Sequence, residues 1–332
     1  MATSLPFSLL ELASVREGDS IGQTLANSVA YARHAESLGF NRFWLAEHHN
    51  MPGIASAATS VLIGHVAGGT STIRVGSGGI MLPHYSAYKV AEVFSLLANL
   101  YPGRIDLGIG RAPGADMTTA VALATDGRPK FERFPELVEQ LRRYLQDDDA
   151  KPVVSPKPPN DLPLWVLGSS ADSAQLAAER GLPYNLALFI NPQAQQELVR
   201  LYKQYFKSSK AGERPYGAVT IGVFCCDTQE QAEEQQHTYD INFFRRLSGQ
   251  FGDPNDVSLL TPAQAKDFAM TPQLEGFIAQ RRQNRAVGTP EQVCSTIRDV
   301  AKCFAADEVM MVTNMFDFED RKRSFELVKN AF

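Results

Sequence analysis

The feature that most limits how this chain can fold is a repeated alternation of β-rich runs and helical segments. Helical periodicity fills most of the intervals between the β-rich runs, and alternating strands and helices build a parallel sheet. Eight such units in 332 residues predict a closed (β/α)8 barrel, the TIM barrel. An open doubly wound sheet is the rival, but its G-x-G-x-x-G fingerprint after the first strand is absent. The eight predicted strands cover residues 6–10, 42–46, 73–82, 104–109, 164–168, 184–188, 218–226 and 308–313.

Several predicted helices carry end signals. A helix is expected over residues 21–39, where Gly39 ends it. In "GTPEQV", Thr289 is a predicted N-cap and Pro290 occupies the first helical position. Residues 318–331 are expected to form the closing helix. These signals reinforce the alternating pattern.

Two segments depart from the alternation. Residues 147–163 are rich in proline and charge, but strand–helix alternation resumes directly after them, so we expect an excursion from the barrel and not a domain linker. Residues 247–287 are polar and weakly periodic, which predicts an insertion between the seventh and eighth strands that acts as a mobile lid loop. We therefore expect residues 1–332 to form a single barrel domain.

Composition excludes several classes of protein. A net charge of −5 gives no indication of a nucleic-acid or anionic-membrane partner. The four cysteines form no C-x-x-C pair and no metal-ligand spacing, as is typical of a protein in the reducing cytoplasm. The first residues lack the basic start and apolar core of a signal peptide. The longest apolar region, residues 54–66, is too short to span a bilayer. We expect a cytoplasmic protein.

The second predicted strand runs directly into Glu47, His48 and His49. Active sites of barrels lie at the carboxyl ends of the strands, and histidine transfers protons near neutral pH. Adjacent side chains on a strand point to opposite faces, so only one histidine should face the barrel mouth. A hydrogen-bonded pair without a catalytic role is the alternative interpretation. A metal site would combine Glu47, one histidine and His84, but neither H-x-H nor H-x-x-x-H spacing accompanies them, so we expect no resident metal.

The third predicted strand contains a glycine-rich stretch, "VGSGGIMLPHY". Gly78 and Gly79 remove side chains where a planar ligand could lie against the backbone, although a β-bulge is an alternative reason for glycine there. In "DLGIGRAPG", at the end of the fourth strand, the spacing is G-x-G-x-x-x-G, and Pro113 stands where a helix should begin. This stretch therefore does not predict a dinucleotide site.

Two neighbouring strand ends suit a phosphate. Arg111 follows the fourth strand, and a guanidinium there binds a phosphate or carboxylate, or forms a plain surface ion pair. The turn Gly168, Ser169 and Ser170 follows the fifth strand, where amides and hydroxyls at a helix start form an anion site or an ordinary cap. Together with the bare glycine backbone and a histidine, these features fit a flat, phosphorylated cofactor such as FMN.

The same stretches resemble a known family. "WLAEHHN", "IRVGSGGIMLPHYSAYKVAEVFSLLANLYPGRIDLGIGRAPG", "WVLGSSADSAQLAAERGLP" and "GTPEQV" occur in the order found in the bacterial luciferase-like flavin-dependent monooxygenases. The chain is most similar to the uncharacterised single-chain bacterial members. The resemblance implies a barrel with FMN at its carboxyl face. His48 then matches the catalytic histidine, and Gly78-Gly79 matches the small-residue pair that carries a non-prolyl cis peptide beneath the flavin ring.

The resemblance also assigns the phosphate end of the flavin. Arg111 matches the arginine near the FMN phosphate, and Ser169 and Ser170 match the phosphate-contacting turn. Residues 247–287 match the region of the family's mobile loop. Two positions depart from the luciferases, which carry a reactive cysteine near the flavin at Gly110 and a glutamate at Ser169. These departures argue against light emission and long-chain aldehyde use.

The resemblance implies a two-component monooxygenase, which we expect to form a homodimer. A separate NAD(P)H:flavin reductase would supply loosely bound reduced FMN, and O2 would form a C4a-hydroperoxyflavin that oxidises a small organic substrate such as an aldehyde or ketone. His48 would donate or remove a proton near that carbon. Three alternatives stay open: a deazaflavin-dependent dehydrogenase on the same scaffold, a metal-dependent hydrolase and a non-catalytic flavin-binding protein.

Overall fold

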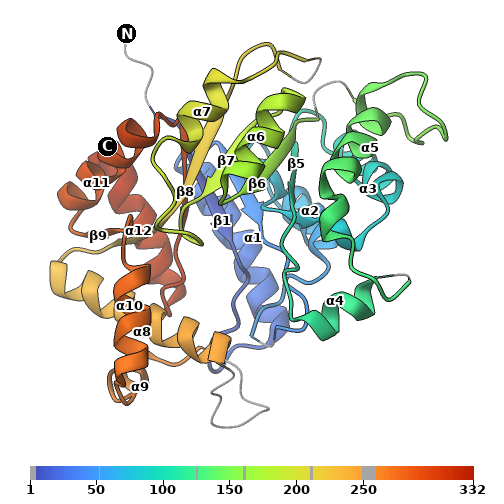
Figure 1. Cartoon of the computed structure of the whole chain (residues 1–332). Helices are drawn as coiled ribbons and strands as arrows, with labels where there is room; N and C mark the ends of the chain where they lie inside the picture. Colours follow the sequence, from blue (N-terminus) through green and yellow to red (C-terminus); the bar gives the residue numbers. More distant parts are fainter. Residues whose placement is uncertain (1–4, 52, 125, 160–161, 210–211, 249–258) are drawn as a thin grey trace.

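The computed structural model describes the chain except residues 1–4, 52, 125, 160–161, 210–211 and 249–258 (Figure 1). Its strands run parallel in the order β10-β1-β2-β3-β5-β6-β7-β8, and β10 also pairs with β8, which closes the sheet into an eight-stranded barrel. The predicted (β/α)8 barrel is confirmed. The strands are β1 (Phe7–Glu11), β2 (Arg42–Leu45), β3 (Arg74–Ser77), β4 (Ile80–Met81), β5 (Ile105–Gly110), β6 (Leu164–Gly168), β7 (Tyr184–Ala187), β8 (Gly217–Cys225), β9 (Ala286–Gly288) and β10 (Glu308–Val312).

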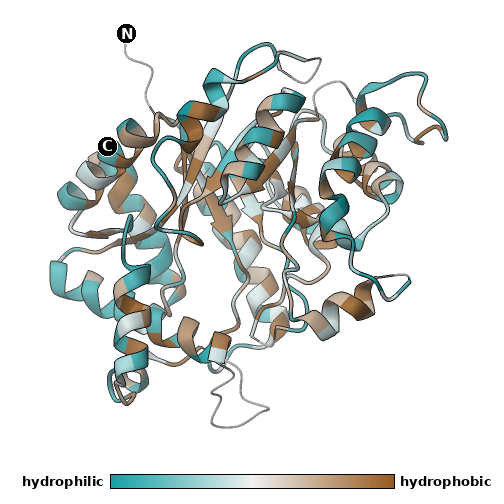
Figure 2. Ribbon diagram, viewed as in Figure 1, coloured by the Kyte–Doolittle hydropathy of each residue, from teal (hydrophilic) through white to brown (hydrophobic). Residues whose placement is uncertain are grey.

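Helices surround the barrel, with their hydrophilic faces turned outward and the hydrophobic strands inside (Figure 2). The α-helices are α1 (Ile21–Ser37), α2 (Thr59–Gly68), α3 (Ala87–Leu100), α4 (Met117–Leu123), α5 (Phe134–Gln146), α6 (Ala171–Arg180), α7 (Leu198–Gln204), α8 (Gln229–Ser248), α9 (Pro262–Lys266), α10 (Pro272–Arg281), α11 (Pro290–Phe304) and α12 (Phe318–Ala331). Two short 3-10 helices are η1 (Leu82–His84) and η2 (Phe131–Arg133). No helix in the described ranges has both the length and the apolar composition needed to cross a membrane.

The predicted helix ends follow from capping groups. Ser20 accepts a hydrogen bond from the Gln23 amide at 3.1 Å and starts α1, and Gly39 follows the helix with φ of 71°. Thr289 is the N-cap of α11, as predicted, with Pro290 at its first position. The capping residues therefore fix where these helices meet the barrel strands.

The predicted third strand, residues 73–82, is divided into β3 and β4. Gly76 pairs with Asp106, and Ile80 pairs with Ile109. The segment from β3 to β4 therefore advances by four residues while β5 advances by three. The extra residue is accommodated at Gly78-Gly79, whose peptide bond is cis. The glycines thus lie at an irregularity of the barrel wall, close to its carboxyl end.

The insertion between β8 and β10 differs from the loop predicted for residues 247–287. Its described part contains α9, α10 and β9, which pairs with the end of β8, and residues 249–258 lie outside the described residues. Only a few apolar side chains of α9 and α10 are buried, which explains the weak periodicity in the sequence. The small core that joins these helices to α8 consists of Ile241, Phe244, Ala265, Leu274 and Ile278.

A charged network ties strands together at the amino end of the barrel. Arg42 Nη1 lies 2.7 Å from Asp106 Oδ2, and Arg42 Nε lies 3.2 Å from Glu308 Oε1. Although burial alone would raise it, the adjacent arginines hold the pKa of Asp106 below its ordinary value. Because both carboxylates are buried and paired, this end of the barrel is built for stability, and the chemistry belongs to the opposite end.

Candidate active site

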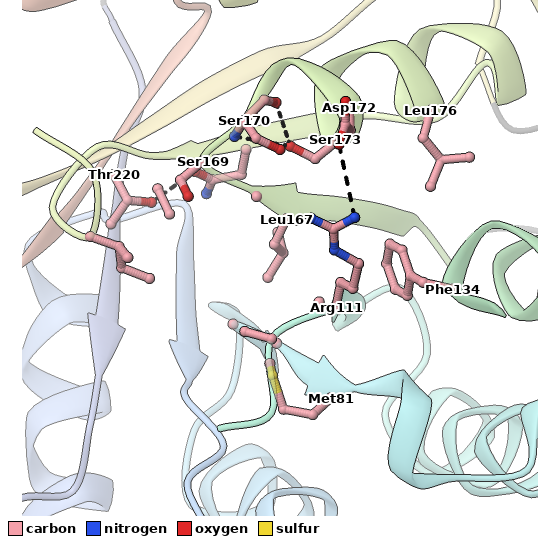
Figure 3. Close-up of a pocket in the computed structure, with 18 of the residues that line it drawn as sticks. Met81, Arg111, Phe134, Leu167, Ser169, Ser170, Asp172, Ser173, Leu176 and Thr220 are labelled. Atoms are coloured by element: carbon pink, nitrogen blue, oxygen red, sulfur yellow. Dashed lines mark hydrogen bonds and ion pairs between the residues drawn. The ribbon is translucent and has the colours of Figure 1, made fainter. Parts of the chain in front are cut away.

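A cavity of about 490 Å³ opens at the carboxyl ends of the strands. Its volume lies within the range of about 300–1,000 Å³ that is usual for small-molecule and cofactor sites. Its lining is mainly apolar, and Figure 3 shows Phe134, Leu167 and Met81 around its walls. All seven residues predicted to bind the cofactor line it, namely Gly78, Gly79, Gly110, Arg111, Gly168, Ser169 and Ser170.

The glycine pair forms one wall of the cavity, and the packing around it explains the absence of side chains. A Cβ on Gly78 would lie 2.5 Å from Leu10 Cδ1. A Cβ on Gly79 would lie 2.7 Å from the carbonyl oxygen of Gly108, a backbone atom that cannot swing away. The close approach of this segment to β5 therefore requires glycine at position 79, and it leaves bare backbone along the cavity.

The polar end of the cavity lies between β5 and α6. Arg111 follows β5 directly, and its side chain is 54% exposed. The amide of Ser170 donates to Ser173 Oγ at 3.4 Å, and Ser173 Oγ donates to the Ser170 carbonyl at 2.7 Å, so these groups order the start of α6. Figure 3 shows Arg111 pointing from β5 toward this turn. A guanidinium and a helix N-terminus that share one cavity are suited to an anion such as a phosphate.

Asp172 adds a carboxylate to this polar end, which the sequence did not indicate. Its Oδ2 lies 3.9 Å from Arg111 Nη1 (Figure 3), and both side chains are exposed. An exposed ion pair of this length contributes little to stability. A bound phosphate would therefore compete with Asp172 for the Arg111 guanidinium.

The adjacent histidines follow the end of β2, and they have different surroundings. His49 Nε2 lies 3.0 Å from the buried Glu47 Oε1, and that oxygen also accepts a hydrogen bond from the Met81 amide at 3.2 Å. His49 is therefore tied to the protein. The His84 ring donates through Nε2 to the Pro113 carbonyl at 2.6 Å, so it supports the loop after β5. Within the described ranges, no cluster of three or more His, Cys, Asp or Glu side chains could hold a metal ion.

His48 has a different environment. Its Nδ1 is buried and has no hydrogen-bond partner in the described part of the chain. Burial, together with the positive charge of Arg246 on α8, lowers the pKa of His48 to about 4, so the imidazole is neutral at pH 7. His48 does not line the cavity that contains Arg111. The predicted catalytic histidine thus lies outside the set of residues that line the cavity with Arg111 and Gly78-Gly79.

Comparison with known proteins identifies the family. The sequence model of the luciferase-like monooxygenase family matches residues 5–307 of this chain. The chain belongs to the luciferase-like monooxygenase family. The uncharacterised protein YvbT of Bacillus subtilis (strain 168) is 42% identical over 98% of this chain and 96% of its own length. A luciferase-like monooxygenase of Escherichia coli (strain K12) is 40% identical, over 99% of this chain and 97% of its own. The crystal structure of apo-MsnO8 has a TM-score of 0.90 and 37% identity, covering 99% and 98% of the two chains.

In this luciferase-like monooxygenase, the cavity has the features that a phosphorylated flavin needs. The glycine wall is a surface that a Cβ would disrupt, and the polar end offers a cation and helix amides. Sequence reasoning missed two charged residues: Asp172 in the first turn of α6, which lies beside Arg111, and Arg246 in the last turn of α8, whose charge lowers the pKa of His48. Their positions depend on how α6 and α8 approach the barrel, and the only sequence signal was the Arg245-Arg246 pair before the predicted insertion.

Proposed function

We propose that this chain is an FMN-dependent monooxygenase that uses reduced FMN and O2 to oxidise a small organic substrate, such as an aldehyde or ketone. A separate NAD(P)H:flavin reductase supplies the reduced FMN, and the enzyme acts in the cytoplasm as a homodimer. The observation that carries the proposal is the convergence of Arg111, the Ser169-Ser170 turn and the bare Gly78-Gly79 backbone on one cavity. Membership of the luciferase-like monooxygenase family supports the same reaction class.

The residues of the chain have distinct tasks in this proposal. Arg111 and the turn at Ser169-Ser170 bind and orient the phosphate, and Gly78-Gly79 provides a flat surface for the rings. When bound, reduced FMN supplies the electrons that activate O2. The apolar walls, including Phe134 in Figure 3, exclude water from the reacting groups.

His48 is the proposed catalytic residue. With a pKa of about 4 it is neutral at pH 7, so it can accept a proton or hydrogen bond on one ring nitrogen and donate a hydrogen bond from the other. The insertion that contains α9 and α10 would cover the mouth and bring α8, with Arg246, next to this imidazole.

A peroxide-yield screen tests the function. Reduced FMN and oxygen are held constant while candidate substrates are varied, and a true substrate lowers the amount of H2O2 released. A His48→Gln variant that binds FMN normally should lose substrate oxidation and release more peroxide. Loading the protein with FMN and, separately, with a deazaflavin checks the cofactor. Tight binding of the deazaflavin without oxygen consumption would favour the dehydrogenase instead.

A further inference from the structure

The Asn185 carboxamide, on the wall of the cavity, is held by a buried hydrogen bond. Of the described residues that line the cavity, two polar ones are buried, Asn185 of β7 and Thr220 of β8, and each is 3% exposed. Thr220 Oγ1 donates to Asn185 Oδ1 at 2.8 Å. A buried hydroxyl needs an acceptor for its proton, so this contact turns Oδ1 toward Thr220 and leaves Nδ2 as the donor end of the carboxamide.

Asn185 Nδ2 has more hydrogen-bonding capacity than the described part of the protein uses. It carries two N–H groups, and its acceptor within the described ranges is the thioether sulfur of Met310, at 3.7 Å. A thioether is a weak acceptor and satisfies at most one of the two N–H groups. Asn185 and Met310 both line the cavity, so a bound molecule can provide the acceptor that the second N–H lacks.

The position of this amide relative to the glycine wall decides which molecule it meets. Thr220 and Met310 lie on β8 and β10, whereas Gly78-Gly79 lies between β3 and β4, beside β5. Around the closed barrel, β6 and β7 separate β5 from β8, and β1 and β2 separate β3 from β10. In Figure 3, Thr220 likewise lies on the side of the cavity away from Arg111. Flavin rings on the glycine wall would therefore turn one face toward Asn185, and a second molecule would lie between them.

The charges of the lining limit what that second molecule can be. Of the described residues that line the cavity, Arg111 and Asp172 are the charged ones, and they lie together at the phosphate end. An anion beside Asn185 would lose its hydration without gaining a cation from this lining, and that loss is costly. An uncharged carbonyl oxygen needs only an N–H donor, which Asn185 Nδ2 provides.

We infer that Asn185 is a specificity-determining residue, which donates a hydrogen bond through Nδ2 to the carbonyl oxygen of an uncharged substrate and which Thr220 holds in position. A cavity that is built to hydrogen-bond such a group discriminates against a molecule of the same shape that lacks it. The inference rests on the proposed function in one respect, because it takes the flavin rings to lie along Gly78-Gly79.

A pair of matched ligands tests the inference in the full-length protein saturated with oxidised FMN. Cyclohexanone is the probe, and methylenecyclohexane has the same ring with C=CH2 in place of C=O. The change in flavin absorbance on titration gives the Kd of each ligand. The ratio of the Kd of the alkene to the Kd of the ketone isolates the hydrogen bond from the apolar contacts. Asn185→Leu should lower this ratio by about 2- to 10-fold, the usual net contribution of a hydrogen bond between uncharged groups.

Further variants separate the donor from the residue that holds it. Asn185→Asp keeps an acceptor for Thr220 but removes the N–H groups, so it should lower the ratio at least as much as Asn185→Leu does. Thr220→Val should lower the ratio by a smaller factor, because the carboxamide stays but is no longer held. Asn99→Leu makes the same substitution at an exposed position of α3 and should leave the ratio unchanged.

The outcomes distinguish this inference from the proposed function. An unchanged ratio in Asn185→Leu and Asn185→Asp, or no binding of cyclohexanone to the wild type, would overturn the inference. Weaker FMN binding by these variants with an unchanged ratio would assign the amide to the flavin instead. Normal FMN binding without the ketone effect leaves the proposed function in place, whereas failure of the wild type to bind FMN would overturn the proposed function and this inference with it.

Discussion

Replacing Arg111 with glutamine isolates the phosphate end of the proposed FMN site. A hydrogen bond to a charged group contributes about 1.5–3 kcal/mol when the group is well shielded. The Arg111 side chain is 54% exposed, so solvent screening reduces its contribution, and we expect a net loss of about 1–2 kcal/mol. That loss corresponds to a rise of about 5- to 30-fold in the Kd for FMN.

Riboflavin, which lacks the phosphate, is the matched ligand for this test. Flavin fluorescence quenching gives the Kd of both ligands for the wild-type protein and for Arg111→Gln. The variant should bind riboflavin as the wild type does, and the preference for FMN over riboflavin should fall by about 5- to 30-fold. The wild-type preference should also weaken with salt. Equal losses for both flavins, or an unchanged preference, would refute the placement of the phosphate beside Arg111.

Three further predictions follow from particular contacts. Asp172→Asn frees Arg111 and should tighten FMN binding by about 2- to 5-fold, with riboflavin unaffected in the same titration. Gly79→Ala places a Cβ 2.7 Å from a backbone oxygen and should lower the free energy of unfolding, measured in urea, by about 1–3 kcal/mol. Gly276→Ala is the control: its Cβ would enter open space, so the protein should not be destabilised. Between pH 7 and pH 4, the wild type should lose about 2–3 kcal/mol more stability than His48→Gln, because the unfolded histidine takes up its proton near pH 6.5 and the folded one near pH 4. A pH series of urea unfolding curves measures this difference, and an equal loss of stability in both proteins would contradict a neutral His48 imidazole with a lowered pKa.

The barrel could be predicted from the sequence because each of its strands is a short, buried run between helical segments. The segment at residues 73–82 reads as one strand, and its division at Gly78-Gly79 follows from the offset in pairing with β5, which a single strand pattern does not contain. In residues 247–287, α9 and α10 bury too few side chains for periodicity to show, so the segment resembles a loop in sequence.

The convergence of the predicted residues on one cavity could also be predicted, because the fold itself brings the ends of neighbouring parallel strands together. Arg111 and the turn after β6 share a cavity for that reason. The position of His48 outside the lining of that cavity could not be predicted, since contacts such as the hydrogen bond between Glu47 and His49 do not follow from the strand pattern. The effect of Arg246 on His48 could not be predicted, because no local sequence signal fixes where the end of α8 lies relative to the end of β2.

The most direct test of the account is a crystal structure of the protein with FMN bound. We expect the phosphate between Arg111 and the Ser169-Ser170 turn, with the rings lying along Gly78-Gly79. A phosphate bound at Arg246, or rings held away from the glycine wall, would contradict the central claim.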